Sequence, residues 1–521
     1  MVEQMTLKEK IGQFFILPII PECDPKQVWE TLRTYRIGGV ILTSIHHPKE
    51  QICWINTLQK WTNIPLLCMQ DAEYGLGMRI SGALSFPKNL TLGAISNNAL
   101  LEEMGESIGE QCKLMGIHLN LAPVVDVSSN PNNPIIGVRS FGEDSRQVAE
   151  KGAALIRGMR KAGILTCAKH FPGHGDTETD SHLNLPIITR SRLQLEEVEW
   201  PPFKRAISEN VSAVMTAHLL VPTIDTYFPT SLSSLTITKL LREEWQFNGL
   251  IITDALNMGA LSTWYCNEKI STESLKTSNN LLFTHCSRNT MDLLHLMVSV
   301  EEHSIETIAL EALKAGNDLL LYGHHQIEQV EYIYQTILPL AFSAIEKAIL
   351  RGEITEEELD RHVIRILSAK ERLGLPWQRE LPHPSKVMRK LCKYSSSDLP
   401  ARLFSEAITL WNMSSDTFPI ESPQYIRLWE EEEPILDPSC TVILALNHPD
   451  QLMSFMEMAK MHSRVILVLF GPPYFLNEIP SGVPVILGYE WCSESERAVW
   501  DIITGKAKVC GTLPVTLALH Q

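Results

Sequence analysis

The sequence of 521 residues predicts an α/β fold, in which a (β/α)8 TIM-like barrel is followed by a smaller α/β sandwich domain. Short apolar runs alternate with amphipathic stretches, which is typical of βα units in a parallel sheet. Eight such units fit into the first stretch of roughly 320 residues, the number that a closed barrel requires. A stretch with several prolines and serines then precedes a new set of apolar runs. An open doubly wound sheet is the alternative arrangement of the same units.

The predicted barrel strands are short apolar runs. In chain order they cover residues 13–17, 39–43, 65–70, 118–122, 164–170, 213–218, 250–254 and 318–322. Helices are predicted where apolar residues recur with the helical period, for example at residues 26–35, 100–114, 146–161, 196–209 and 306–315. Thr355 and Glu358 match a capping box, which predicts one more helix that ends near Gly374.

These elements divide the chain into three parts. Residues 1–375 form the predicted barrel, residues 376–400 a linker, and residues 401–521 a C-terminal α/β domain with strands at 441–446, 465–470 and 484–488. Residues 264–303 lack a clean period and are predicted to be an insertion after the seventh strand. In the second domain, Glu490 is the one acid whose proximity to the mouth of the barrel should be checked.

Composition and charge exclude several classes of protein. With 44% hydrophobic and 20% charged residues, the chain is expected to be globular. A net charge of −16 without long blocks of one sign argues against a nucleic-acid or anionic-membrane partner. No apolar run approaches the ~18 residues of a spanning helix, and Glu3, Glu9 and Pro18 argue against a secretory signal near the N-terminus. Eleven cysteines without a C-x-x-C pair favour a reducing, cytoplasmic location. The oligomeric state is left open.

Ionisable residues stand at the ends of four predicted strands. Asp71 and Glu73 follow the third strand, Lys169 and His170 end the fifth, His218 ends the sixth and Asp254 ends the seventh. Because the carboxyl ends of barrel strands converge, these side chains are expected to lie close together. Buried charges are costly unless they are paired or used, so the pattern predicts a functional site.

The segment from Lys169 to His182 is the densest in chemistry. It contains His170, His174, His182, Asp176, Glu178 and Asp180. A metal site is one interpretation and a polar surface loop is another. Pro172 and Gly173 prevent two of the histidines from sharing a helical face, so we predict no metal. Asp180 and His182 project to one face of an extended segment, which favours proton donation by the imidazole, while Asp254 is placed to attack an electrophilic carbon.

Four motifs together resemble the family 3 glycoside hydrolases. They are the K-H-F-P-G-H-G-x-x-x-x-D-S-H string that ends at His182, Asn133-Pro134 followed by Arg139-Ser140-Phe141-Gly142, Met215-Thr216-Ala217-His218, and Ile252-Thr253-Asp254-Ala255-Leu256-Asn257-Met258. Within the family, the chain is similar to the β-N-acetylglucosaminidases of peptidoglycan recycling. The resemblance covers roughly residues 5–375.

The resemblance implies a role for each matching residue. Asp254 corresponds to the nucleophile, His182 to the general acid/base and Asp180 to the partner of His182. Six further residues are predicted to bind the substrate: Asp71, Arg79, Arg139, Lys169, His170 and His218. No metal and no cofactor is implied. One departure concerns the loop from Asp71 to Arg79, where Tyr74 and Gly77 replace the usual pattern.

The expected activity is that of a retaining exo-β-N-acetylglucosaminidase acting on muropeptides or related hexosaminides. The usual retaining mechanism pairs two carboxylates, so a histidine acid distinguishes this type from relatives that cleave plain β-glucosides. Three alternatives stay open: a phosphorylase that uses the same site, a catalytically silent barrel that binds cell-wall fragments, and a route assisted by the 2-acetamido group.

Overall fold

The computed structural model describes residues 2–43, 47–181, 183–265, 290–375, 383–430, 435–480 and 482–517, with the backbone alone for residues 290–302. The predicted insertion at 264–303 therefore lies largely outside the described residues. Its last part, from Thr290 onward, is the beginning of helix α10.

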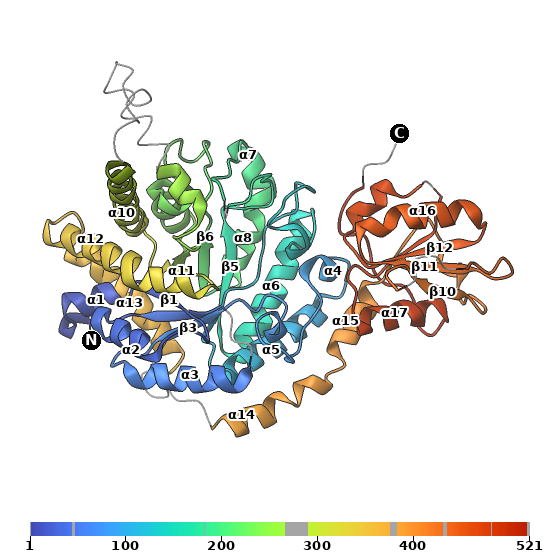
Figure 1. Cartoon of the computed structure of the whole chain (residues 1–521), viewed down its shortest axis with the longest axis horizontal. Coiled ribbons are helices and arrows are strands. Elements are labelled where there is room, and N and C mark those ends of the chain that lie inside the picture. Colours follow the sequence, from blue (N-terminus) through green and yellow to red (C-terminus); the bar gives the residue numbers. More distant parts are fainter. Residues whose placement is uncertain are drawn as a thin grey trace, which may run out of the picture.

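Eight parallel strands form the predicted barrel, in the order β7-β6-β5-β4-β3-β2-β1-β8 (Figure 1). A parallel bridge between Ile252 and Leu319 joins β7 to the beginning of β8 and closes the ring. The strands are β1 Phe15–Ile19, β2 Gly39–Leu42, β3 Leu67–Gln70, β4 Leu119–Asn120, β5 Leu165–Phe171, β6 Ala213–Thr216, β7 Leu250–Thr253 and β8 Leu320–Leu321. The predicted barrel fold is confirmed.

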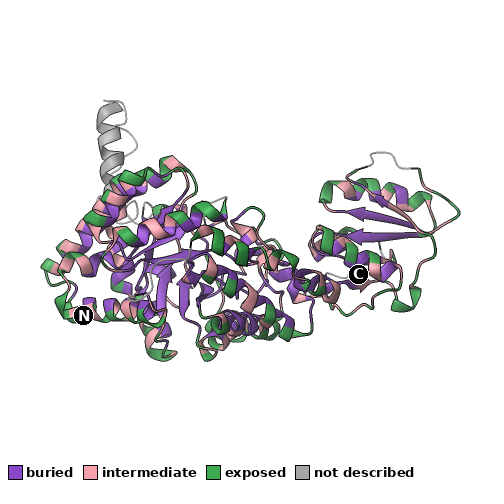
Figure 2. Ribbon diagram, turned by 90° about the horizontal axis from the view of Figure 1, so that it is seen from below, coloured by how far each residue is buried: buried purple, intermediate pink, exposed green. Residues whose placement is uncertain are grey.

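Helices surround the strands and bury their apolar faces against them (Figure 2). The longer ones are α1 Leu7–Gly12, α2 Pro25–Tyr35, α3 Pro48–Trp61, α5 Asn98–Leu114, α6 Ser145–Ala162, α8 Trp200–Ser208, α10 Thr290–Ala315, α11 Ile327–Tyr332, α12 Leu338–Leu350 and α13 Glu356–Arg372. Thr355 and Glu358 form the predicted capping box at the start of α13.

One continuous helical stretch among the described residues, Ile327–Leu350, is long and apolar enough to cross a membrane by length and composition alone. It belongs to the outer ring of the barrel and packs against it. The ring of Phe342 stacks on that of Phe15 in β1, with their centroids 5.9 Å apart. Its apolar composition is that of a helix packed in a core.

The second domain is a five-stranded sheet with the order β10-β11-β12-β13-β9, in which β9 is antiparallel to β13. The strands are β9 Thr409–Trp411, β10 Gln424–Arg427, β11 Val442–Leu446, β12 Val465–Leu469 and β13 Val485–Leu487; the helices are α15 Leu399–Ala407, α16 Leu452–Met461 and α17 Ser493–Ile503. The central three strands match predicted runs. Strands β9 and β10 were not predicted, because these edge strands are short and only partly apolar.

The described part of the range predicted as a linker contains helix α14, Pro384–Leu391, and the beginning of α15. Helix α14 buries Val387 and Leu391 and packs against α3 and α5 of the barrel. This connection therefore runs along the barrel surface to the second domain, as Figure 1 shows.

Polar contacts fasten the second domain to the barrel beside the loops that follow β3 and β4. Glu490 Oε1 accepts hydrogen bonds from the backbone N–H of Lys88 and from Thr91 Oγ1, both at 2.8 Å, at the start of helix α4, Asn89–Gly93. Tyr474 Oη lies 2.8 Å from Ser128 Oγ. Glu490 thus joins the domains, and it does not line the cavity described below.

Candidate active site

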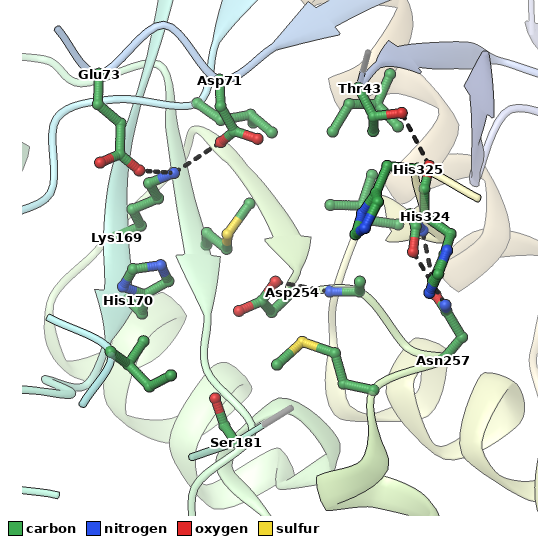
Figure 3. A pocket seen from close by; sticks show the side chains of 18 of the residues that line it. Thr43, Asp71, Glu73, Lys169, His170, Ser181, Asp254, Asn257, His324 and His325 are labelled. Atoms are coloured by element: carbon green, nitrogen blue, oxygen red, sulfur yellow. Dashed lines mark hydrogen bonds and ion pairs between the residues drawn. The ribbon is translucent and has the colours of Figure 1, made fainter. Parts of the chain in front are cut away.

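A cavity of about 440 Å³ opens at the carboxyl ends of the barrel strands (Figure 3). Its volume lies in the range of small-molecule sites, and barrel enzymes place their catalytic groups at this end. The polar side chains that line it come mainly from the segments that end or follow β2, β3, β4, β5, β7 and β8. They are Thr43, Asp71, Glu73, Arg79, Arg139, Lys169, His170, His174, Ser181, Asp254, Asn257, His324 and His325.

Oppositely charged side chains alternate along one wall of this cavity. Lys169 Nζ lies 2.8 Å from Asp71 Oδ1 and 2.8 Å from Glu73 Oε1. Arg139 binds Glu73 through two hydrogen bonds of 2.8 and 3.1 Å. Burial by itself raises the pKa of Glu73, but Arg139 and Lys169 outweigh it and lower that pKa. Burial also raises the pKa of Asp71 by itself, but Lys169 and Arg79 outweigh it and lower that pKa. Both acids are therefore ionised, and the wall offers fixed charges and hydrogen-bond partners to the hydroxyl groups of a sugar.

The loop after β3 brings Arg79 to this wall despite its unusual sequence. Arg79 Nη2 lies 3.2 Å from Asp71 Oδ2. Gly75 has a φ of 100°, and Gly77 packs so closely on Ser85 Oγ that a Cβ has no room there. The two glycines permit a compact turn, which holds Arg79 beside Asp71.

Asp254 follows β7 and is half-buried in the middle of the cavity. Its Oδ1 accepts a hydrogen bond of 2.8 Å from the backbone N–H of Ala255. Burial by itself raises the pKa of Asp254, but His170, His218, this N–H group and Lys169 outweigh it and lower the pKa. The carboxylate is therefore ionised at neutral pH, as a nucleophile requires.

His218, predicted to be a substrate-binding residue, does not line the cavity. It is buried behind the wall, where Nε2 lies 3.0 Å from the carbonyl oxygen of Ala255 and Nδ1 lies 2.8 Å from Ser231 Oγ. The end of β6 points this side chain at the neighbouring loop instead of the opening. His218 thus supports the backbone that carries Asp254.

Asp126 is a residue of the site that the sequence analysis missed. Its fully buried carboxylate accepts hydrogen bonds from the backbone N–H groups of His170 and His174, at 3.1 and 2.7 Å, and lies 2.7 Å from His170 Nδ1. Its only signal in the sequence is an acid after the apolar run Val124-Val125, beyond the predicted end of the fourth strand. Asp126 fixes the position and ring orientation of His170.

The loop that leads to His182 is anchored at its base by His174. Its Nε2 lies 3.1 Å from Ser181 Oγ and its Nδ1 lies 3.0 Å from Thr177 Oγ1. Burial lowers the pKa of His174 to about 4, so the ring is neutral at neutral pH. Asp180 is partly exposed beside this anchor. His182 itself lies outside the described residues, as does any contact of His182.

Among the residues that the structure describes, no group of three or more His, Cys, Asp or Glu side chains has the arrangement of a metal site. His170 and His174 are neighbours with ring centroids 5.9 Å apart. The first is oriented by Asp126 and the second by Ser181 and Thr177. Both are thus accounted for by hydrogen bonds within the protein.

The cavity therefore brings together six of the residues predicted from sequence: Asp71, Arg79, Arg139, Lys169, His170 and Asp254. It also includes residues for which no role was predicted. Glu73 was noted only as a strand-end acid, and Thr43, Asn257, His324 and His325 were not singled out.

A comparison with known families agrees with this site. The model of the glycosyl hydrolase family 3 N terminal domain matches residues 6–305. The chain belongs to glycosyl hydrolase family 3. The family resemblance inferred from the motifs is therefore confirmed, and a solved family 3 structure shares the arrangement of barrel and second domain.

Relatives of this family 3 chain include β-hexosaminidases. It is similar to "Beta-hexosaminidase A" of Pseudoalteromonas piscicida, with 34% identity over 265 residues, which cover 46% of this chain and 44% of that protein. It thus spans less than half the length of that relative. A "Beta-N-acetylglucosaminidase/beta-glucosidase" of Cellulomonas fimi is 26% identical over 435 residues, covering 82% of this chain and 68% of that protein.

Among solved structures, a family 3 β-N-acetylglucosaminidase from Paenibacillus sp. str. FPU-7 superposes with a TM-score of 0.75 and 26% identity. The match covers 99% of this chain and 100% of that one. The similarity thus extends over both domains.

Proposed function

We propose that this family 3 chain is a retaining exo-β-N-acetylglucosaminidase that removes terminal β-linked N-acetylglucosamine from muropeptides or related hexosaminides. The observation that carries the proposal is the ionised Asp254 carboxylate in the middle of a cavity whose wall is lined by Asp71, Arg139, Lys169 and His170. This arrangement combines a nucleophile with a set of partners for hydroxyl groups. The names of the relatives support a hexosaminide as the substrate.

The proposed reaction has two steps. In the first, a carboxylate oxygen of Asp254 forms a bond to C1 of the sugar while the bond from C1 to the leaving oxygen breaks, and His182 gives its proton to that oxygen. In the second, His182 takes a proton from water, the water oxygen bonds to C1, and the bond to Asp254 breaks. Asp180 supports the proton transfers as the partner of His182. The configuration at C1 is retained.

Muropeptides and a cytoplasmic location are the finer parts of the proposal. The motif around His182 supports them, because it resembles the peptidoglycan-recycling members of the family. All nine cysteines among the described residues are unpaired, which agrees with a reducing compartment. The net charge of −16 supports a small carbohydrate instead of nucleic acid or an anionic membrane as the partner.

Release of 4-nitrophenol from 4-nitrophenyl N-acetyl-β-glucosaminide tests the proposal. We expect turnover by the wild type, loss of activity to background in Asp254→Ala, and a fall in kcat of about 10² to 10⁴-fold in His182→Ala. Asp450→Asn, at an exposed acid of the second domain, is the matched control and should keep full activity. Full activity of Asp254→Ala would overturn the proposal.

Two additions to the assay separate the remaining alternatives. Addition of inorganic phosphate should not yield sugar 1-phosphate, which a phosphorylase would release. A slow 5-fluoro analogue of the substrate should label Asp254, whereas the acetamido-assisted route leaves Asp254 unlabelled. Binding of N-acetylglucosamine without turnover of any hexosaminide would instead identify a silent barrel.

A further inference from the structure

The cavity has two chemically different ends, with Asp254 between them in the view of Figure 3. At one end, Lys169, Glu73 and Asp71 form the alternating charges described above. At the other, the described lining residues around His324 and His325 are uncharged. They are Ile41, Thr43, Asn257, Leu321 and Gly323.

Hydrogen bonds to the backbone hold the segment with His324 and His325, which follows β8, in one position. Asn257 exchanges two hydrogen bonds with Gly323, of 3.0 and 3.1 Å, and Thr43 Oγ1 donates to the carbonyl oxygen of His324 at 2.9 Å. His324 Nδ1 accepts a hydrogen bond of 3.1 Å from the backbone N–H of Gln326. In its neutral form His324 therefore carries its proton on Nε2.

The two imidazole rings are stacked, with centroids 4.9 Å apart and planes at 11° to one another. Burial and the neighbouring His325 lower the pKa of His324, so its ring favours the neutral form. Because Nδ1 of His324 already accepts the hydrogen bond from Gln326, its neutral ring can donate to a carboxylate through the Nε2–H group while it keeps that bond. The pair is thus suited to an anionic ligand, on the side of the cavity where the other described side chains carry no charge.

The charges at the opposite end are already paired. Lys169 is shared by Asp71 and Glu73, Arg139 binds Glu73, and Arg79 binds Asp71. A sugar without a net charge fits that end, where hydroxyl groups exchange hydrogen bonds with paired ions. A substrate with its reacting carbon at Asp254 then extends its leaving group toward the histidines.

We propose that His324 and His325 form a subsite for the leaving group and bind a carboxylate that this group carries. The inference rests on the proposed function, since it assigns the two ends of one substrate to the two ends of the cavity. It predicts that leaving groups with a carboxylate are preferred over uncharged ones.

Two substrates that differ in one carboxylate test the inference: 4-nitrophenyl and 3-carboxy-4-nitrophenyl N-acetyl-β-glucosaminide. The quantity to measure is the kcat/KM of the carboxylated substrate divided by the kcat/KM of the uncarboxylated one. The intrinsic reactivity of each leaving group is the same for every variant, so a change in this ratio reports recognition of the carboxylate. We expect this ratio to fall about tenfold in His324→Gln and in His325→Gln, and further in the double variant.

Two controls accompany these variants. His303→Gln, at an exposed histidine of α10, should leave the ratio unchanged. His325→Lys supplies a positively charged donor without an aromatic ring. It should therefore preserve the preference for the carboxylated substrate, whereas a stacking platform for a neutral sugar would be lost.

The outcomes separate the inference from the proposed function. Turnover of both substrates with the same ratio in wild type and variants overturns the subsite and leaves the glycosidase intact. An equal loss on both substrates also overturns it, because the pair then acts on the common sugar or on folding. Turnover of neither substrate by the wild type contradicts the proposed function itself.

Discussion

The ionisation of Asp254 depends on single side chains around it. Its carboxylate lies in a half-buried cavity, where burial raises its pKa, and His170 is the largest opposing influence. His170 is in turn fixed by Asp126, from a neighbouring strand end. His170 and Asp126 behind it thus favour the ionised form of the Asp254 carboxylate.

Replacement of His170 should be visible in the pH profile. In His170→Asn the imidazole that lowers the pKa of Asp254 is replaced by a neutral amide, so that pKa rises. Because the ionised carboxylate is the active form, the acidic limb of kcat/KM should move to higher pH, together with a fall of roughly tenfold at neutral pH from the lost substrate contact. The profile is measured with the 4-nitrophenyl substrate. Met215→Leu, an uncharged change in the same cavity, should leave the limb in place; an unmoved limb in His170→Asn would refute the assigned charge effect.

At the scale of elements, the loop after β5 connects the charged wall of the cavity to His182. Its base is fixed by a compact set of hydrogen bonds. Asn133 Nδ2 donates to the carbonyl oxygen of His174 at 2.8 Å and to Thr177 Oγ1 at 3.1 Å, and His174 holds Ser181. The residue before His182 is therefore tied to the barrel.

Removal of the hydrogen bond between His174 and Ser181 should slow the chemical step. Ser181→Ala leaves His174 Nε2 buried without this partner, which costs about 1 kcal/mol and loosens the segment that carries His182. We expect kcat to fall roughly fivefold while KM changes little, measured by steady-state kinetics. Glu178→Ala, an exposed change in the same loop, serves as the control. A KM effect without a kcat effect would mean that Ser181 acts on substrate binding instead.

At the scale of the whole molecule, the second domain is connected to the charged wall of the cavity through helix α4. Glu490 accepts hydrogen bonds from the first turn of α4, where Asn89 Nδ2 donates to the carbonyl oxygen of Arg139 at 2.7 Å. Arg139 binds Glu73 and thereby the charged wall. The domain contact and the wall therefore share one continuous set of hydrogen bonds.

A change at this contact between the domains should weaken substrate binding. Glu490→Ala leaves the N–H of Lys88 and the hydroxyl of Thr91 without their acceptor, so α4 and Arg139 are held less firmly. We expect KM for the 4-nitrophenyl substrate to rise roughly fivefold with kcat nearly unchanged. Glu494→Ala, at an exposed acid a short distance along the same domain, is the matched control. If both variants keep wild-type KM, the second domain does not position the wall.

The sequence by itself determined the barrel, the central strands of the second domain and the family. It could do so because these depend on local periodicity and on motifs that are contiguous in the chain. The same reasoning placed Asp71, Lys169, His170 and Asp254 at converging strand ends.

Only the tertiary structure decided how these residues are used. It turned His218 away from the cavity, put Asp126 behind His170, and brought His324 and His325 opposite the charged wall. Each of these depends on contacts between segments far apart in the chain, such as Asp126 and His170 at a sequence separation of 44 or Asn257 and Gly323 at a separation of 66. Side-chain direction at a strand end is set by such neighbours, and no local pattern in the sequence records them.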